Sequence, residues 1–495
     1  MAIDEQDEAA ATRLREATEA LEAVVRDRSV LRALSVDERT RLLSAAGDVF
    51  NPNVVQRRRG VKEVKKRHRA AKVQRDENVL AGTGIRVLRE KPVFTTPNVY
   101  PPRDFEQVEV DDPAVRETVE PQHCYVCKQP YTDLHPFYDQ LCPPCGELNF
   151  RKRSETADLG GRVALLTGGR VKIGYQAGIK LLRAGAHLIV TTRFPRDSAE
   201  RYAREADFEE WGDRLEIFGL DLRHTPSVEA FCTHLLATRE RLDFIVNNAC
   251  QTVRRPAEFY RHMLEGETAS AETMAAPVRA LLGAYEGLRR TEMLTAGSAE
   301  LSQSPLLPED VVARSDLFPE GRLDQDLQQV DLRDRNSWRL LLDEVSSVEL
   351  LETQLVNAVA PFVLNARLKP LMLKTPERDK HIVNVSAVEG QFYRRFKTTR
   401  HPHTNMAKAA LNMMTRTSAA DYHASGIHMN SVDTGWVTDE DPLEIAERKT
   451  AEQRFRPPLD IVDGAARIVD PIIDGSNTGE HVWGQFLKDF RPTDW

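Results

Sequence analysis

The sequence predicts an α/β protein whose main domain is a doubly wound, mostly parallel sheet, preceded by a helical N-terminal region and a small cysteine-bearing knuckle. Three observations predict this organisation. The stretch VALLTGGRVKIG at 163–174 is an apolar run that turns through glycines into a helical pattern. Further short apolar runs alternate with helical patterns toward the C-terminus, and two CxxC pairs precede them. Such alternation requires a sheet with helices on both faces.

Length and composition narrow the class of protein. With 495 residues and 41% hydrophobic content, the chain can bury a large core and form two or three domains. The net charge of -8 does not indicate a nucleic-acid binder as a whole. We expect a cytoplasmic protein, because the N-terminal segment lacks a signal peptide, no apolar run reaches membrane-spanning length, and six cysteines are too few for a disulfide framework.

The first 89 residues are predicted to be helical, with a capping box at Ser35 and Glu38. Between Arg57 and Arg75 lie ten lysines or arginines and one acid. This pattern is typical of a solvated helix face, and a contact with a nucleic acid or a protein is the alternative. Prolines and acids over 90–122 indicate a linker or a wrapping arm.

The domain at 159–495 contains six predicted strands. Between Asn248 and Asn357 the chain is much longer than a crossover needs, so we expect an insertion at about 255–345 near the rim of the sheet. The predicted strands are Val163–Thr167, His187–Thr192, Leu215–Asp221, Phe244–Val246, His381–Ser386 and His428–Val432.

The cysteine pairs predict a zinc knuckle at 123–150. Cys124 and Cys127 form one CxxC pair, Cys142 and Cys145 form the other, and fourteen residues separate the pairs. Two such turns can present four thiolates to one tetrahedral zinc ion, which leaves no open position for a substrate and makes the metal structural. The histidines at 123 and 135 lie close enough to compete as ligands, and free buried thiols are the plain alternative.

The glycine turn also predicts a dinucleotide site, because the free N–H groups at a helix N-terminus attract a pyrophosphate. Six landmarks follow in order: the Thr167-Gly168 turn with Gly174, the pair Asp221-Leu222, the run Asn247-Asn248-Ala249, and then Asn357, Ser386 and Lys408. In this respect 159–495 resembles the short-chain dehydrogenase/reductase family. The resemblance implies a Rossmann-type fold, a homo-oligomer and oxidoreductase activity with a nicotinamide cofactor.

The resemblance also assigns cofactor contacts. Lys172 stands where the family has its middle glycine, and Asp433-Thr434-Gly435-Trp436 replaces the family's Pro-Gly segment beside the nicotinamide carboxamide. Arg193 after the second strand, with Arg170, favours NADP over NAD, while an exposed strand-end arginine would leave NAD as the cofactor. The expected contacts are Thr167, Gly168, Arg170, Lys172, Ile173, Gly174, Arg193, Asp221, Leu222, Asn248, Ala249 and Lys408.

By the same resemblance, Ser386 polarises a carbonyl, Lys408 holds the ribose and Asn357 seats a water. The family's catalytic tyrosine corresponds to Thr404, which is a far weaker acid. Tyr393, His401 or His403 could supply the proton instead, or the site could bind the cofactor without turnover.

Basic segments at the expected strand ends, Arg254-Arg255 and GQFYRRFKTTRHPHT, suggest an anionic small-molecule substrate. Pairing with local acids such as Glu389, Asp439 and Glu440 explains them equally well. The sequence thus predicts an NADP(H)-dependent oxidoreductase acting on a carbonyl or alcohol. The alternative is a silent NADP-binding scaffold or sensor that contacts protein or nucleic acid through the knuckle and the basic helix.

Overall fold

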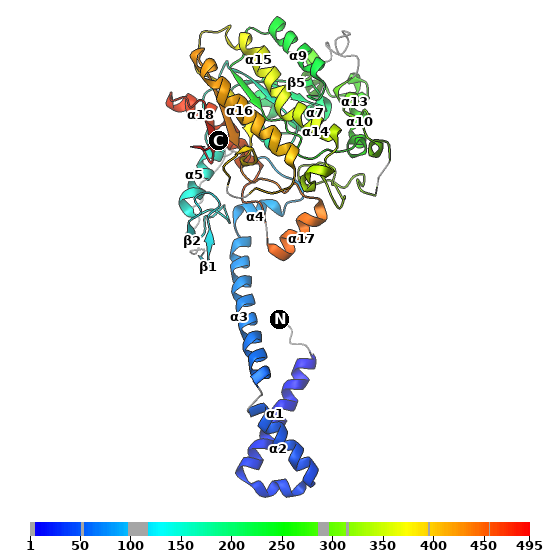
Figure 1. The fold of residues 1–495 in the computed structure, drawn as a ribbon, viewed down its shortest axis with the longest axis vertical. Coiled ribbons are helices and arrows are strands. Elements are labelled where there is room, and N and C mark those ends of the chain that lie inside the picture. The colour runs from blue at the N-terminus through cyan, green and yellow to red at the C-terminus, as the bar shows by residue number, and fades with distance from the viewer. Residues whose placement is uncertain are drawn as a thin grey trace. The chain divides into compact units, whose positions relative to one another are not determined.

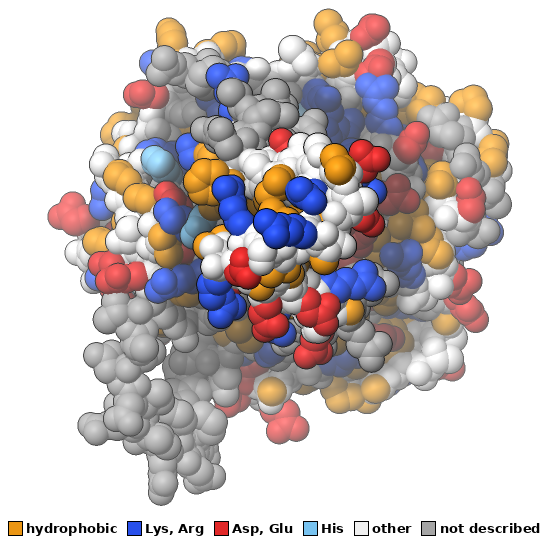
Figure 2. Space-filling model, turned by 90° about the horizontal axis from the view of Figure 1, so that it is seen from below, with side chains coloured by type: hydrophobic (Ala, Val, Ile, Leu, Met, Phe, Trp, Pro, Cys, Tyr) orange, Lys and Arg blue, Asp and Glu red, His pale blue; other side chains and the backbone are white. Residues whose placement is uncertain are grey.

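The structure is a computed structural model that describes residues 5–50, 54–97, 117–285, 297–312, 316–394, 397–454 and 456–495 (Figure 1). The chain forms two compact units, Met1–Glu77 and Asn78–Trp495. Each described helix is too short or too polar to span a bilayer. On the face shown in Figure 2, basic and acidic side chains are interspersed.

The first unit is helical, as predicted. It contains α1 (Glu5–Arg26), a 3-10 helix (Arg28–Ala33), α2 (Val36–Phe50) and most of α3 (Val54–Ala81). The predicted capping box is present at the start of α2, because the Ser35 N–H donates to Glu38 Oε2 at 2.9 Å and the Glu38 N–H donates to Ser35 Oγ at 3.3 Å. On α3, Val61 and Val64 are exposed, so the basic segment lies on a largely solvated helix.

The second unit is built on a mostly parallel sheet in the order β10-β9-β8-β7-β6-β3-β4-β5, with only the β10–β9 pair antiparallel in the described residues. All six predicted strands are present, at nearly the predicted bounds. The strands are β3 (Val163–Thr167), β4 (His187–Thr192), β5 (Leu215–Gly219), β6 (Phe244–Asn247), β7 (Lys380–Ser386), β8 (Ile427–Asp433), β9 (Phe486–Lys488) and β10 (Arg491–Thr493).

Helices cover both faces of this sheet (Figure 1). α9 packs on α15 and α16 packs on β7 and β8, whereas α6 packs on α18. The helices of the domain are α6 (Lys172–Arg183), α7 (Pro195–Ala203), α8 (Phe208–Trp211), α9 (Thr225–Thr238), α10 (Arg261–Thr268), α11 (Ala276–Ala280), α13 (Ser298–Ser302), α14 (Ser347–Gln354), α15 (Ala360–Met372), α16 (Pro402–Ala424), α17 (Leu443–Gln453) and α18 (Ile461–Thr478).

The predicted insertion contacts the edge of the sheet. The Ile217 N–H of β5 donates to the carbonyl oxygen of Leu281 at 2.8 Å, and Leu281, Leu282 and Tyr285 are buried in the main core. A smaller cluster joins Phe259 of the insertion to Phe194 at the end of β4. The insertion therefore completes the core beyond β5 as well as bordering the cavity described below.

The cysteine knuckle is docked on the sheet domain. It consists of β1 (Glu117–His123), β2 (Pro130–Asp133) and α5 (Pro143–Ser154), so 117–122 belong to a strand and not to the predicted linker. Buried polar contacts tie it to α18. Tyr138 donates to Asp463 at 2.5 Å, and Arg153 donates to Asp460 at 2.6 Å. An apolar cluster that contains Ile85 of α4 (Gly84–Arg89) fills the contact between the knuckle and the sheet domain.

Four histidines gather where β7 and β8 begin. His381 is fully buried, its Nε2 lies 3.0 Å from His481 Nδ1, and its ring lies 5.2 Å from that of His428. The ring of His423 lies 5.2 Å from that of His428 and stacks on Trp483. Burial lowers the pKa of His381 well below its ordinary value, and the neighbouring histidines lower it further. Burial also lowers the pKa of His428.

We expect this cluster to make the fold acid-sensitive. Both histidines stay neutral when folded but take up protons near their ordinary pKa of about 6.5 when unfolded, so stability falls as pH drops below that value. The free energy of unfolding falls by up to about 1.4 kcal/mol per pH unit for each buried histidine. Between pH 7.5 and 5, the melting temperature of His381→Gln should depend less steeply on pH than that of the wild type. His187→Gln, at an exposed position on β4, is the control, and an unchanged slope in His381→Gln would contradict the assignment.

Candidate active site

The turn between β3 and α6 has the geometry of a phosphate-binding loop. Gly168 has φ +70°, and a Cβ at Gly174 would lie 2.2 Å from the carbonyl oxygen of Gly168, so both positions require glycine. Asn248 Nδ2 donates to the carbonyl oxygens of Thr167 and Gly168 at 3.1 Å, and Thr167 Oγ1 accepts from the Ala249 N–H at 3.0 Å. These bonds fix the loop beside the end of β6, with the free N–H groups of α6 beyond it.

Lys172 adopts the left-handed conformation that a glycine would take, with φ +54°. A side chain is therefore accommodated there at a cost of about 1–2 kcal/mol in backbone strain. Burial alone would lower the pKa of Lys172, but the carboxylates of Glu440, Asp326 and Asp324 raise it on balance. Lys172 lines the cavity described below, and it forms no direct ion pair within the described part of the chain.

The predicted site residues converge on one cavity of about 1020 Å³. Thr167 lies beneath the loop, and Asn357, Thr404, Tyr393 and His403 do not line the cavity. The predicted residues that do line it are Gly168, Arg170, Lys172, Ile173, Gly174, Arg193, Asp221, Leu222, Asn248, Ala249, Ser386, His401 and Lys408.

Ser386 and Lys408 lie together in the buried wall of this cavity. Ser386 is the last residue of β7, and its Oγ donates to the carbonyl oxygen of Lys408 at 3.4 Å. Lys408 Nζ donates to the carbonyl oxygen of Val385 at 2.8 Å. The polar atoms of Asn357, in a π-helical turn at Leu355–Val359, bond to the backbone of Gln251 at 2.7 and 3.1 Å. Asn357 thus braces the segment after β6 from outside the cavity.

The candidates for the proton donor lie in different surroundings in the structure. Thr404 is buried, and its Oγ1 has no hydrogen-bond partner in the described structure. Tyr393 is 91% exposed. His403 faces Glu349, with 3.6 Å between Nε2 and Oε1. Of these candidates, only His401 lines the cavity together with Ser386.

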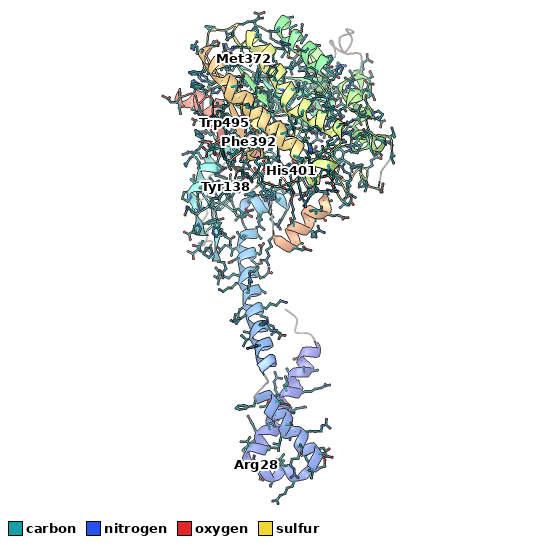
Figure 3. The ribbon with its side chains drawn as sticks, viewed as in Figure 1. Arg28, Tyr138, Met372, Phe392, His401 and Trp495 are labelled. Carbon is teal, nitrogen blue, oxygen red and sulfur yellow. The ribbon has the colours of Figure 1, made fainter. Side chains whose placement is uncertain are left out.

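His401 caps the start of α16 with φ +44° (Figure 3). Its ring stacks on Trp338, with 3.8 Å between the centroids and 5° between the planes. Burial lowers the pKa of His401 to about 4, against an opposing effect of the Glu389 carboxylate. The imidazole is therefore neutral near pH 7 and can accept a proton from an alcohol or hand one back.

Arginines surround the part of the cavity beyond β4 and β5. Arg193 donates to the Tyr260 hydroxyl at 2.7 Å and lies 4.6 Å from the centre of that ring. Arg170 is paired with Asp197 at 2.7 Å. Burial would raise the pKa of Asp221, but the Arg223 guanidinium, 2.7 Å away, outweighs it and lowers the pKa on balance. Sequence reasoning missed Arg223 and Tyr260, which carried no motif signal.

The basic segments predicted to face an anion are partly paired with local acids. Arg254 forms ion pairs with Asp310 at 2.5 Å and with Glu352 at 3.1 Å, and Arg394 pairs with Glu389 at 2.9 Å. The cavity lining nevertheless contains more basic than acidic residues. Twelve lysines or arginines line it, against six acidic residues, although Arg170 and Arg255 pair with Asp197 and Asp331 behind the lining. This balance favours an anionic ligand.

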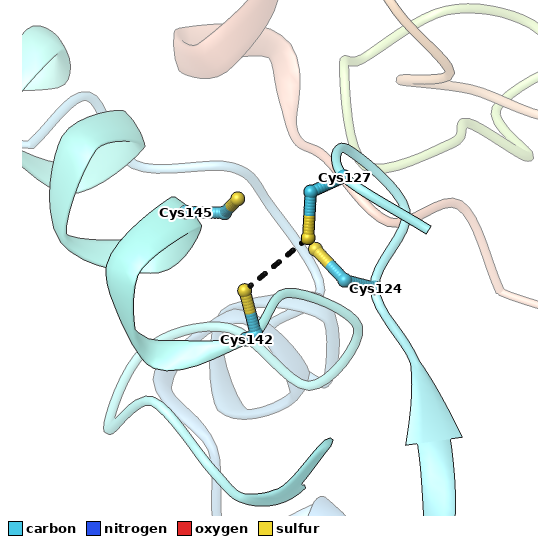
Figure 4. Close-up of side chains that lie close together, drawn as sticks. All are labelled: Cys124, Cys127, Cys142 and Cys145. Carbon is cyan, nitrogen blue, oxygen red and sulfur yellow. Dashed lines mark hydrogen bonds between the residues drawn. The ribbon is translucent and has the colours of Figure 1, made fainter. Parts of the chain in front are cut away.

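The four cysteines of the knuckle point toward one another (Figure 4). Their sulfur atoms all lie within 4.8 Å of one another, and Cys127 Sγ lies 3.7 Å from Cys142 Sγ. This separation fits four thiolates around one zinc ion. The competing histidine at 135 accepts hydrogen bonds at Nδ1 from the Phe137 and Tyr138 N–H groups, so it serves the turn and not the cluster.

Comparison with known proteins identifies the family. A model of the short chain dehydrogenases matches residues 162–269, and a model described as enoyl-(acyl carrier protein) reductase matches residues 339–458. The unmatched stretch between them falls within the predicted insertion. An uncharacterized protein of Acanthamoeba polyphaga mimivirus is 30% identical over 382 residues, which cover 74% of each chain.

Named relatives match shorter segments. Dehydrogenase/reductase SDR family member 13 of Bos taurus is 33% identical over 118 residues, which cover 23% of this chain and 29% of the bovine protein. Among solved structures, the Pseudomonas aeruginosa RhlG/NADP active-site complex is 16% identical with a TM-score of 0.41, covering 67% of this chain and 95% of that chain. The fold and the site define a dinucleotide-binding oxidoreductase. The chain belongs to the short-chain dehydrogenase/reductase family, a class of NAD(P)-dependent oxidoreductases.

Proposed function

We propose that this protein transfers hydride between NADP(H) and the carbonyl or alcohol carbon of an anionic small molecule. The observation that carries the proposal is the single cavity that joins the phosphate-binding loop to Ser386, Lys408 and His401 and has twice as many basic as acidic residues in its lining. A positive, partly enclosed cavity attracts both the cofactor phosphates and an acidic substrate.

The choice of NADP over NAD rests on Arg193. No acidic side chain stands at the end of β4 to bind a ribose 2′-hydroxyl, because the strand ends in Thr191 and Thr192 and Arg193 comes next. Arg193 is oriented by the Tyr260 hydroxyl and lines the cavity, where its guanidinium would meet the 2′-phosphate. Lys172 supplies a further charge toward the phosphates.

We expect Arg193→Ala to weaken NADPH binding by about 10- to 100-fold, because a charge-assisted contact to phosphate contributes about 1.5–3 kcal/mol. Binding of NADH should change by less than about threefold, since it lacks that phosphate. Fluorescence titration with both cofactors gives the two dissociation constants. An equal weakening of NADPH and NADH binding would show that Arg193 does not select between the two cofactors.

The chain's own residues suggest how the proton moves. The Ser386 hydroxyl would donate a hydrogen bond to the substrate oxygen, and Lys408 would hold the ribose and keep the local potential positive. His401, held flat against Trp338, would take the proton in alcohol oxidation and return it in reduction. The bound nicotinamide would supply or accept the hydride. Thr404 has no role in this scheme.

The cysteine cluster would hold a structural zinc ion, because protein thiolates can fill all four positions. No coordination position is then left for the reaction, so the metal would act through the fold of the knuckle. Zinc analysis of the purified protein should give about one ion per chain.

The proposed activity is tested by following NADPH oxidation over a panel of carbonyl compounds. Oxo acids and phosphorylated carbonyls form one half, and neutral ketones and aldehydes of similar size form the other. Turnover should concentrate in the anionic half, and Ser386→Ala should abolish it while NADPH binding is retained. Tight NADPH binding with no turnover in either half would instead favour the silent scaffold or sensor.

A further inference from the structure

The metal knuckle also borders the active-site cavity. Tyr125 and Lys128, from the turn that carries Cys124 and Cys127, line the same cavity as Ser386 and Lys408. The knuckle therefore borders the cavity in addition to packing on the sheet domain.

Tyr125 makes a specific contact across the cavity wall. Its hydroxyl oxygen accepts a hydrogen bond from the Trp436 N–H at 3.0 Å. Gly435 has φ +75°, and a Cβ there would lie 2.5 Å from the Leu459 side chain and 3.4 Å from the Tyr125 hydroxyl, so the two segments approach closely. Two ammonium groups also lie over the Tyr125 ring, with Lys128 Nζ 4.7 Å and Lys488 Nζ 5.2 Å from its centre.

The segment held by Tyr125 is next to the catalytic strand. Residues 433–437 begin at the last residue of β8 and line the cavity, and Asp433 is the register partner of Ser386 on β7. Lys488 Nζ lies 3.5 Å from Asp433 Oδ2, while the Asp433 carboxylate also accepts from the Val388 N–H at 3.3 Å. A shift of 433–437 would therefore change the floor of the cavity beside Ser386.

The backbone around Tyr125 is fixed chiefly by the knuckle itself. The Cys124 N–H donates to the carbonyl oxygen of Gln129 at 2.9 Å, the Tyr125 N–H donates to that of Gln140 at 2.9 Å, and the Lys128 N–H donates to that of Cys124 at 3.0 Å. Metal ligands at 124 and 127 would flank Tyr125 on both sides, so a metal bound to the cysteine cluster would add to the hydrogen bonds that hold this backbone.

We propose that Tyr125 is a positioning residue through which the metal-bound knuckle holds segment 433–437 against the cofactor end of the cavity. The expected effect on cofactor binding rests on the proposed function. The expected effect on segment 433–437 rests on the contacts alone. The metal is then structural in its ligands, and it is coupled to segment 433–437 through the Tyr125–Trp436 hydrogen bond and the apolar cluster that Cys124 shares with Val437.

Tyr125→Phe tests this in the full-length, metal-loaded protein, because it removes only the hydroxyl. We expect unchanged zinc content, about tenfold faster hydrogen exchange at the Trp436 amide, and NADPH binding weakened about three- to tenfold. Tyr131→Phe is the matched control: its hydroxyl donates to the carbonyl oxygen of Asp139 at 3.0 Å within the knuckle, and it does not line the cavity. It should leave hydrogen exchange at the Trp436 amide and NADPH binding at wild-type values even if it lowers the melting temperature.

Removing the metal with a chelator provides the second arm, and it should speed exchange in 433–437 at least as much as Tyr125→Phe does. Wild-type exchange at the Trp436 amide in Tyr125→Phe, or wild-type exchange in 433–437 after metal removal, would overturn the proposal. If exchange responds as expected but wild type itself does not bind NADPH, the coupling stands and the proposed function fails. If Tyr131→Phe alters 433–437 as strongly as Tyr125→Phe, the knuckle acts by general stability and the positioning role is wrong.

Discussion

Replacing His401 by asparagine is expected to lower kcat by about 10²- to 10⁴-fold, the usual contribution of a positioned acid or base. The imidazole lines the cavity with Ser386 and Lys408 and is held by Trp338, whereas the residue at the family's tyrosine position, Thr404, is buried outside the lining. Steady-state rates with the best compound of the anionic panel give kcat. NADPH titration of the same variant should give a dissociation constant close to that of wild type.

Two matched variants make this assignment specific. Tyr393→Phe should retain kcat, because the tyrosine is almost fully exposed. Thr404→Val should also retain it, because the hydroxyl has no partner in the described structure and valine has nearly the same shape. A loss in either variant as large as that in His401→Asn would contradict the role of His401.

The pH profile gives an independent readout of the same residue. Because burial lowers the pKa of His401 to about 4, the neutral imidazole persists through the physiological range. Alcohol oxidation should therefore lose its base only as pH falls toward 4, and not near the ordinary histidine value of about 6.5. A step in kcat near pH 6.5 that disappears in His401→Asn would show that the ring is solvated in the working enzyme.

The second large effect is expected from Cys142→Ser. Loss of one thiolate should release the metal and unfold the knuckle, at a cost of several kcal/mol and about 5 °C in melting temperature. The destabilisation should extend to the sheet domain, because Cys142 and Cys124 belong to a buried apolar cluster with Leu459 and Ile461 of that domain. Differential scanning calorimetry and metal analysis measure both consequences.

Cys250→Ser is the control for that experiment, because this cysteine is exposed and lies outside the cluster. It should keep the bound metal and the melting temperature. If Cys142→Ser also keeps both, the four thiols are an unliganded cluster, and the structural metal must be abandoned.

The sheet could be predicted from the sequence because buried parallel strands appear in it as short apolar runs. β3 and β4 begin and end at the predicted residues, since glycines or polar turns bound them. β9 and β10 were missed because each has only three residues, and β10 contains Pro492. β1 was taken for linker because Pro121 and nearby acids dominate its composition, while its pairing with β2 is set by the knuckle.

The glycine loop of the candidate site could be predicted because it follows the end of a strand. Ser386 and Lys408 were predicted from the resemblance to the family, and both line the cavity. The orienting groups were not: Tyr260 and Trp338 come from the insertion, and Tyr125 comes from the knuckle, far from the sheet in sequence. Their roles depend on tertiary contacts with Arg193, His401 and Trp436, and periodicity carries no signal for such contacts.

Calorimetric titration of the purified chain with NADPH and NADH tests the central claim most directly. The account predicts one NADPH site per chain with a dissociation constant on the order of 1 μM, or about -8 kcal/mol, and binding of NADH at least tenfold weaker. Absence of binding heat with both cofactors, confirmed by unchanged cofactor fluorescence, would contradict the dinucleotide site and the chemistry assigned to Ser386, His401 and Lys408.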